Sequence, residues 1–370
     1  TFTNTGLSNI GSGATLAAGV ITNDAAATLN VTTNSTLQGT GNTLNNSGTI
    51  NVGTNGIVTD DGDINNLAGG IINFNGPAGT ATLDANDLFP GTPGTISNAA
   101  TAQINVFDGD VTVGNDNVNT AGTISVNTFS TMAGIAALNQ TDGSIEGGGT
   151  IDVTGLFNQT GGATSGTVDI NADSFTQSGG ASVGAGTFVT SAGAQNLNGG
   201  TVSGALDGAG AITVATGTTA LDGGTITNAT TLEVTSGALN ETNSGSIDTA
   251  GNSITVSGTG TLTTDGNGIA DGETVIVEGT GTLTVNGADT IASLDQNGGT
   301  VNGNSTLTVT GLYDQSGATS TTGGTVTVSA ATFNQSGGAT IATGTTVNAS
   351  GDKTLSGGSI AGTLGGNGNT

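Results

Sequence analysis

The sequence predicts an all-β protein, a parallel β-solenoid of about 18 coils with about 20 residues in each coil. Three observations lead to this fold class. A Gly-Gly step returns every 18 to 24 residues after a short strand-like segment, as in 157–162 and 333–338. Segments such as 282–285 and 325–328 alternate Thr with Leu or Val, which is the period of half-buried strands. Glycine supplies 69 of the 370 residues, and tight corners repeated in every coil require it.

The first part of the chain, residues 1–149, carries a pattern of the type Asn-x-Gly-x-Ile-x-Asn. Residues 46–52 are one example, and Ile104 recurs as Ile124 after 20 residues. Residues 75–94 interrupt this spacing and hold all three prolines of the chain, Pro77, Pro90 and Pro93. Because proline cannot donate to a strand ladder, we expect a loop over 75–94 that leaves the solenoid. That loop is either a protruding functional element or a simple insertion.

The later part of the chain is predicted to be a duplication inside one continuous solenoid that covers residues 1–370. Blocks 150–305 and 306–370 resemble each other at an offset of about 157 residues, and 153–159 matches 309–315. Such an offset is close to eight coils. Duplication of a whole block is therefore the way in which this solenoid is lengthened.

The composition favours a narrow interior over a wide globular core. Hydrophobic residues make up 33% of the chain, but only 3% are aromatic and Trp is absent. Small and β-branched side chains fill a solenoid coil, whereas wide cores depend on large aromatic ones. Disorder is the alternative for a chain rich in Gly, Ser and Asn. The alternating strand pattern argues against it.

The charge excludes several classes of partner. With 27 acidic residues, one basic residue and no His, the net charge is −26. Binding to phosphates requires cations, so we expect no nucleic-acid partner and no attraction to an anionic membrane. No Cys is present, and no run approaches the roughly 20 apolar residues of a membrane span. The chain starts at Thr1 without a signal-peptide pattern, so we expect a processed or excised segment.

The Asn-x-Gly-x-Ile-x-Asn pattern, the Gly-Gly corners and the Thr/Val strands resemble bacterial extracellular β-helix proteins. These are adhesins of the filamentous-haemagglutinin type and autotransporter passengers. The resemblance implies a right-handed parallel β-helix, an extracellular or cell-surface location, and a role in adhesion, aggregation or biofilm formation. The chain lacks an obvious N-terminal secretion cap, which leaves open a repeat segment of a larger protein and a free-standing fibre subunit.

Catalysis is the chemistry that the residue inventory disfavours. Parallel β-helices also include polysaccharide lyases and glycoside hydrolases, and a lyase generally uses Arg or Lys as its base. This chain offers only Lys353. Hydrolysis needs two carboxylates, which Asp108 and Asp110 could provide, but Tyr313 is the only Tyr available for stacking on a sugar. We therefore expect no enzymatic activity, no catalytic residues and no required cofactor.

Calcium binding is the more serious chemical possibility, because Ca²⁺ takes oxygen ligands from closely spaced Asp and Asn in Gly-rich loops. The best candidate is the segment 265–273, which resembles short calcium loops but lacks a third acidic ligand before its central Gly. Its candidate ligands are Asp265, Asn267, Asp271 and Glu273. A second group consists of Asp61, Asp63 and Asn65, and a third of Asp108, Asp110 and Asp116. The alternative for each group is a set of solvated turn residues.

Three further expectations are structural. Asn51, Asn73 and Asn105 each follow an Ile and are expected to form a ladder of amides along the solenoid axis. Phe157 with Phe175, and Tyr313 with Phe333, are expected to stack in the interior. Lys353 invites an isopeptide hypothesis, but the segment 351–354 has the composition of an exposed turn, so we expect a plain surface lysine.

The predicted function is structural: a rigid acidic solenoid outside a bacterium, mediating adhesion, cell–cell contact or biofilm matrix. The expected partners are further copies of the chain, or glycans and proteins of a host or neighbouring cell surface. The alternative is a self-assembling subunit of an extracellular filament, tube or sheath, because neither end of the sequence looks like a cap. A polysaccharide-active enzyme is the third possibility.

Overall fold

The structure is a computed structural model that describes residues 1–85 and 93–366. Within these residues the secondary structure consists of 45 strands, β1 to β45, and includes no helix that could span a membrane. The chain divides into two compact units. Unit 1 comprises residues 1–176 and 180–190, and unit 2 comprises 177–179 and 191–370.

In each unit the strands pair in parallel with strands of the preceding and following coils, and they form three faces. Long strands bend round a corner and contribute to two faces. In unit 1, face 1 contains β1 (Phe2–Asn4), β8 (Asp63–Asn66), β10 (Thr95–Asn98), β12 (Asn117–Thr120), β15 (Ala137–Gln140) and the ends of β3 (Thr15–Asn23), β5 (Thr36–Asn46), β17 (Thr150–Gln159) and β19 (Asp169–Ser178). Face 2 contains β2 (Leu7–Ile10), β4 (Thr28–Val31), β6 (Thr49–Val52), β13 (Thr123–Val126), β16 (Ser144–Gly147), β18 (Ala163–Gly166), β20 (Ser182–Val183) and the starts of β9 (Ile71–Asp84) and β11 (Gln103–Val113). Face 3 contains β7 (Ile57–Asp60), β14 (Thr131–Ile135), β21 (Phe188–Ser191) and the remaining halves of the long strands.

Unit 2 repeats this arrangement. Its face 1 contains β22 (Gln195–Asn198), β25 (Ala211–Val214), β28 (Thr231–Val234), β31 (Ser253–Val256), β33 (Thr274–Val277), β36 (Ser293–Gln296), β43 (Lys353–Leu355) and the ends of β38 (Thr306–Gln315) and β40 (Thr327–Gln335). Face 2 contains β23 (Gly200–Val202), β26 (Thr218–Asp222), β29 (Ala238–Thr242), β32 (Thr261–Thr264), β34 (Thr282–Val285), β37 (Thr300–Gly303), β39 (Thr321–Thr322), β41 (Thr340–Ile341) and β44 (Ser359–Ile360). Face 3 contains β24 (Ala205–Gly208), β27 (Thr225–Thr227), β30 (Ser246–Asp248), β35 (Asp289–Ile291), β42 (Thr346–Ala349), β45 (Thr363–Gly365) and the starts of β38 and β40.

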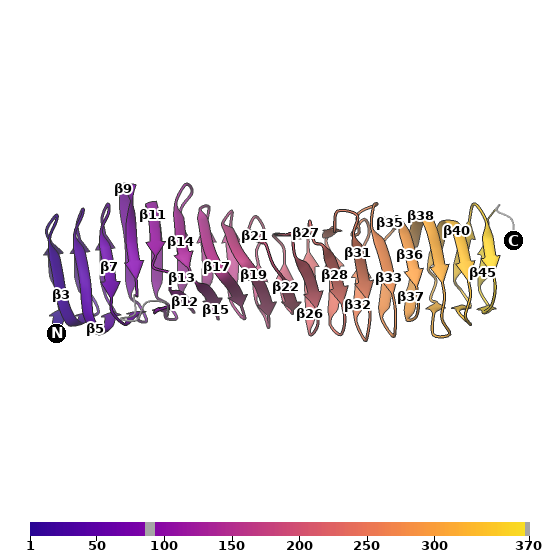
Figure 1. Cartoon of the computed structure of the whole chain (residues 1–370), viewed down its shortest axis with the longest axis horizontal. Helices are drawn as coiled ribbons and strands as arrows, with labels where there is room; N and C mark the ends of the chain where they lie inside the picture. The colour runs from indigo at the N-terminus through magenta and orange to yellow at the C-terminus, as the bar shows by residue number, and fades with distance from the viewer. Residues whose placement is uncertain (86–92, 367–370) are drawn as a thin grey trace. The chain divides into compact units, whose positions relative to one another are not determined.

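The predicted coil of about 20 residues is confirmed. Ile104 pairs with Ile124 one coil later, and Figure 1 shows β3, β5, β7 and β9 lying side by side as successive coils. The parallel β-solenoid predicted from the sequence is therefore the fold. The right-handed winding and the continuity of a single solenoid over residues 1–370 stay predictions.

The interior is built from the inward-facing half of each strand. In the four-residue strands the second and fourth side chains are typically buried, as in β6, where Ile50 and Val52 are fully enclosed. Equivalent Ile, Leu and Val residues stack in register from coil to coil, for example Leu29 on Ile50 and Ile50 on Ile72. Burying each such side chain contributes about 1.5–3 kcal/mol, so the repeated alternation holds the coils together.

The proline-containing segment differs from the expected loop. Residues 75–84 belong to β9, and only a short excursion interrupts its pairing with β11, between Asn75 opposite Asp108 and Thr80 opposite Asp110. Pro77 lies in this excursion, where no ladder hydrogen bond is required of it. Residues 86–92 of the predicted loop, including Pro90, lie outside the described residues.

Strands β17 and β38, which start the two predicted duplicated blocks, have the same pattern of burial along their ten residues. Phe157 stacks on Phe175 with ring centroids 5.2 Å apart, and Tyr313 packs against Phe333 at 5.1 Å. All four rings are fully buried, as the sequence predicted. The described part of each unit therefore contains an aromatic pair inside its coils.

Candidate functional site

Among the described residues of unit 1, the most exposed large apolar side chain is a phenylalanine at the tip of a turn. Phe129 is 98% exposed and has a positive φ of 70°, in the turn between β13 and β14. Phe107 is 46% exposed at the same corner of the preceding coil, where its carbonyl oxygen accepts a hydrogen bond of 3.0 Å from the Asn127 side chain. A large apolar side chain held out from a turn is accessible for contact with another surface.

A shallow groove runs along this corner, between face 2 and face 3, over four successive coils. It is lined by Phe107, Asn127, Thr128, Gly147, Gly148, Gly166 and Thr167. The glycines leave backbone peptide groups of the groove without side chains above them. The packing requires glycine here, because a Cβ on Gly147 would lie 2.0 Å from the carbonyl oxygen of Val126. The lining offers an aromatic ring, an amide, hydroxyls and exposed peptide groups. It holds no titratable side chain, so it is suited to contact rather than to acid–base chemistry.

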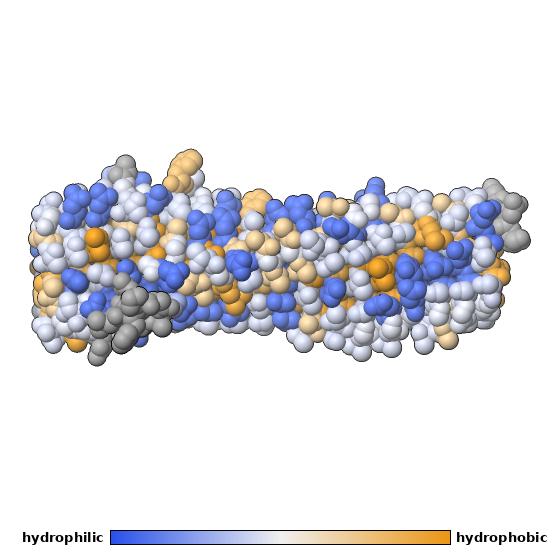
Figure 2. Space-filling view, in the orientation of Figure 1, coloured by the Kyte–Doolittle hydropathy of each residue, from blue (hydrophilic) through white to orange (hydrophobic). Residues whose placement is uncertain are grey.

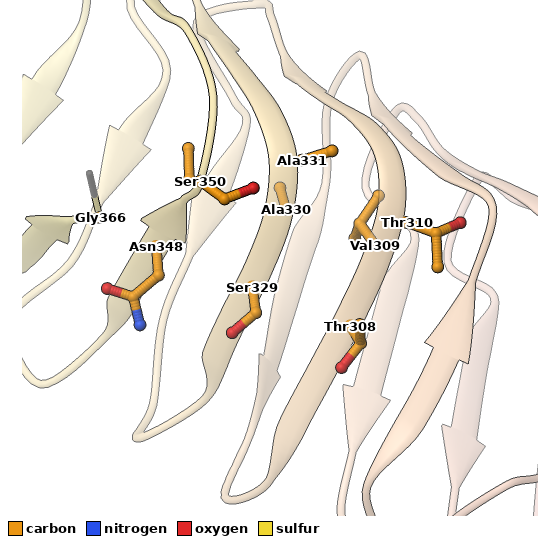
Figure 3. A pocket seen from close by; sticks show the side chains of 10 residues that line it. Thr308, Val309, Thr310, Ser329, Ala330, Ala331, Asn348, Ser350 and Gly366 are labelled. Atoms are coloured by element: carbon orange, nitrogen blue, oxygen red, sulfur yellow. The ribbon is translucent and has the colours of Figure 1, made fainter. Parts of the chain in front are cut away.

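A second groove, in unit 2, crosses β38, β40 and β42. Figure 3 shows that its lining consists of short Thr, Ser, Ala, Val and Asn side chains. No carboxylate is among the ten lining residues. On the face seen in Figure 2, small hydrophilic and hydrophobic patches alternate, and the deep orange of the most hydrophobic residues appears in small separate patches.

The residues predicted to bind calcium differ in burial and in hydrogen bonding. In the segment 265–273, the side chains of Asp265, Asn267 and Asp271 are exposed. Glu273 is buried, and its carboxylate accepts hydrogen bonds from the backbone N–H groups of Thr249 (2.9 Å) and Gly251 (3.1 Å) and from the Thr249 hydroxyl. Its oxygens are therefore occupied by the turn of the preceding coil.

The second predicted calcium group lies along a corner of unit 1. Asp61 is half-buried, Asp63 is exposed, and the amide of Asn65 donates to Asn45 of the preceding coil at 3.2 Å. In the third group, Asp110 accepts from the backbone N–H of Thr131, and Asp116 is buried. Within residues 1–85 and 93–366, no three His, Cys, Asp or Glu side chains form a group that could hold a metal ion.

Buried carboxylates are the feature that the sequence did not reveal. Asp60 is fully enclosed and lies against Gly39 of the preceding coil, where an added Cβ would be 1.6 Å from Oδ2 of Asp60. Its Oδ1 accepts a hydrogen bond of 2.9 Å from the Gly62 N–H. Burial raises the pKa of Asp60 to about 6, and the nearby Asp61 and Asp63 raise it as well. In the register of face 3, this carboxylate follows Ala18 and Gly39 of the two preceding coils.

Asp84 and Asp116 form a related pair beside the part of unit 1 that is not described. Asp116 accepts hydrogen bonds from the backbone N–H groups of Ala85 (2.6 Å) and Gly94 (2.9 Å), which partly offset the rise that burial causes in its pKa. Burial and the charge of Asp116 both raise the pKa of Asp84. Asp60 and Asp116 share one role, which is to accept hydrogen bonds from turn amides that have no strand partner.

The predicted asparagine ladder is confirmed. Asn51 donates to Asn30 at 2.8 Å, Asn73 to Asn51 at 2.9 Å, and Asn105 to Asn73 at 2.9 Å, all on the outer side of face 2. Lys353, however, is not a surface residue: it is 6% exposed at the start of β43, next to Phe333 in register. The expectation of an exposed turn was wrong because β43 joins face 1 and turns this side chain inward.

Comparison of the chain with protein-family models, with curated proteins and with solved structures finds no match.

Proposed function

We propose that the protein is a structural component of the bacterial cell exterior, a stiff acidic β-solenoid that mediates adhesion, cell–cell contact or biofilm matrix. The observation that carries this proposal is the corner of unit 1 at which Phe129 is 98% exposed beside a groove without titratable groups. A solenoid that stacks every coil on its neighbours supplies a rigid support for such a contact surface. The net charge of −26 favours solubility of the protein when it is not bound to a partner.

The same observations support the expectation that the chain is not an enzyme. The lining of both grooves described above lacks carboxylates, and the buried carboxylates of Asp116 and Glu273 accept hydrogen bonds from turn amides. A surface with exposed aromatic rings, amides and hydroxyls suits a glycan or a protein on a neighbouring cell.

The test is a binding assay with the purified chain immobilised on beads and incubated with bacterial cells, host cells and glycan arrays. Phe107→Ser/Phe129→Ser removes the aromatic anchors from residues that contribute little to the core. We expect cell or glycan capture to fall by about tenfold or more, because the loss of an aromatic anchor removes at least about 1.4 kcal/mol of binding.

The matched control is Leu7→Ser, which removes another exposed apolar side chain of unit 1, 71% exposed on β2. This control is expected to bind like the unaltered chain. Capture that is equal in all three proteins, or absent from the unaltered chain, would contradict the contact role of this corner. Release of reducing ends from polysaccharides would instead support an enzyme.

A further inference from the structure

Three polar side chains point into the solenoid at one corner of unit 2, in three successive coils. Glu241 is the second-last residue of β29 on face 2, Thr264 ends β32 in the next coil, and Asp289 starts β35 on face 3 in the coil after that. They are 1%, 1% and 2% exposed. The inward residues that precede and follow them in these columns are apolar, with Leu221 before Glu241 and Leu307 after Asp289. The corner is therefore a polar pocket inside an apolar interior.

The backbone of the middle coil uses only half of this polar capacity. The turn after β32 donates from the Asp265 N–H to Oε2 of Glu241 at 2.6 Å, and from the Ile269 N–H to Oδ1 of Asp289 at 3.3 Å. The other carboxylate oxygens, Oε1 of Glu241 and Oδ2 of Asp289, are buried and accept no hydrogen bond within the described part of the chain. The buried Oγ1 of Thr264 likewise makes no hydrogen bond of standard geometry there, although it lies close enough to the Asp289 carboxylate to lower its pKa.

These three groups are close enough to influence one another. Burial raises the pKa of Glu241, and the charge of Asp289 raises it further. Burial also raises the pKa of Asp289 to about 6, although the Ile269 and Thr290 amides and the adjacent Thr264 hydroxyl lower it. Two enclosed carboxylates of like charge destabilise a fold unless a cation or a proton compensates them. The only basic side chain of the protein, Lys353, lies on β43, several coils away.

We propose that this corner is an internal calcium site, with Oε1 of Glu241, Oδ2 of Asp289 and Oγ1 of Thr264 as side-chain ligands. All three are hard oxygen donors, and no nitrogen or sulfur donor belongs to the group, which favours Ca²⁺ over transition metals. Ca²⁺ takes about six to eight oxygens and sheds its water readily, so it suits a buried site better than Mg²⁺ does. Backbone carbonyl oxygens of the adjoining turns, 265–268 and 286–288, would supply further ligands.

The proposed site differs from the exposed loop that the sequence suggested. Asp265, Asn267 and Asp271 face solvent, and the ion would lie beneath their turn, between the two inward carboxylates. The side chains of the exposed loop would then cover the site without binding the ion. The inference does not depend on the adhesive role of unit 1, because it concerns the stability of coils in unit 2.

The test is calcium titration of the full chain after chelator treatment, followed by calorimetry and by thermal unfolding. We expect a single class of calcium site with a dissociation constant of about 10⁻³ M or tighter, in the range of extracellular modules. Saturating calcium is expected to raise the melting temperature of the unaltered chain, because binding to the native state alone stabilises it. Calcium binding is expected to fall at least about a hundredfold in Glu241→Gln/Asp289→Asn, which keeps shape and acceptors but removes both charges.

Two further variants separate this site from its alternatives. Thr264→Val keeps the volume and introduces the residue type found next in the column, Val285, and it is expected to weaken calcium binding about tenfold without loss of the fold. Asp265→Asn/Asp271→Asn alters only the exposed loop and is expected to bind calcium as the unaltered chain does. The proposal is overturned if calcium does not raise the melting temperature of the unaltered chain. It is also overturned if calcium still raises the melting temperature of Glu241→Gln/Asp289→Asn, or no longer raises that of Asp265→Asn/Asp271→Asn.

Discussion

At the scale of single residues, ladders of hydrogen-bonded Asn side chains recur along this protein. A second ladder, which the sequence did not predict, lies at the inner end of the face 1 strands. Its Asn members are fully or almost fully buried, and each donates both to the next side chain and to a backbone carbonyl oxygen. They are Asn4, Asn23, Asn46, Asn66 and Asn98. The corner amides therefore satisfy carbonyl groups that the turns would otherwise leave unpaired.

Asn46→Ala should lower the free energy of unfolding by about 3 kcal/mol, because it leaves several buried polar groups without a partner. Asn46 accepts from Asn23 at 2.7 Å and donates to Asn66 at 2.8 Å and to the Ile71 carbonyl oxygen at 3.1 Å. Urea denaturation followed by circular dichroism measures the change.

The matched control is Asn51→Ala on the outer ladder, where Asn51 is half-buried. Water can replace its lost amide bonds, so we expect a loss of about 1 kcal/mol or less. Equal losses for Asn46→Ala and Asn51→Ala would show that burial does not set the strength of these ladders.

At the scale of the element, one coil is three short strands joined by corners, and it cannot bury its inner side chains alone. The aromatic pairs illustrate this. Phe157 and Phe175 lie on the long strands β17 and β19 of successive coils and cover each other inside the solenoid. Because the rings belong to different coils, they couple neighbouring coils more strongly than the surrounding aliphatic residues do.

Phe157→Ala is expected to lower the stability by about 3–5 kcal/mol, because it opens a cavity in a core too narrow to collapse around it. Phe188→Ala is the control, since Phe188 is 51% exposed on β21, and its expected loss is about 1 kcal/mol or less. The shift of the urea midpoint reports both effects. A loss below about 1 kcal/mol for Phe157→Ala would contradict a close-packed interior.

At the scale of the whole molecule, the protein has a large excess of negative charge, and several of its carboxylates are buried in the interior. Burial raises the pKa of Asp60 and of Asp289 to about 6, above the usual value of 3.8 for Asp. An acid whose pKa is raised by folding binds a proton more readily in the native state than in the unfolded chain. Its contribution to stability is fully present below about pH 4 and is lost as the pH rises through about 6.

We therefore expect the melting temperature in the presence of a chelator to increase as the pH falls from about 7 to about 5. Protonation also reduces the mutual repulsion of the acidic surface and acts in the same direction. Scanning calorimetry at stepped pH measures the trend. Asp60→Asn should flatten this pH dependence, since the amide cannot titrate. A melting temperature that decreases over the same interval would contradict the raised pKa values.

The sequence by itself determined the coil period, the parallel strands, the outer ladder of Asn51, Asn73 and Asn105, and the enclosure of Phe157 and Tyr313. These follow from local alternation and from repeats, which are visible along the chain. It did not distinguish Asp60 from Asp61, or Glu241 from Asp265, as the buried carboxylates, nor Phe129 as the exposed ring.

Only the tertiary structure decided these points. Whether a side chain faces the interior depends on how its strand pairs with strands about 20 residues away, and a shift of one residue in that register reverses every side chain of the strand. Corners make the inward side chains still harder to predict, because the turn geometry before each strand determines which residue of that strand is the first to face the interior. The repeats therefore determine the solenoid fold, whereas the strand register at the corners determines which side chains are buried and which are exposed.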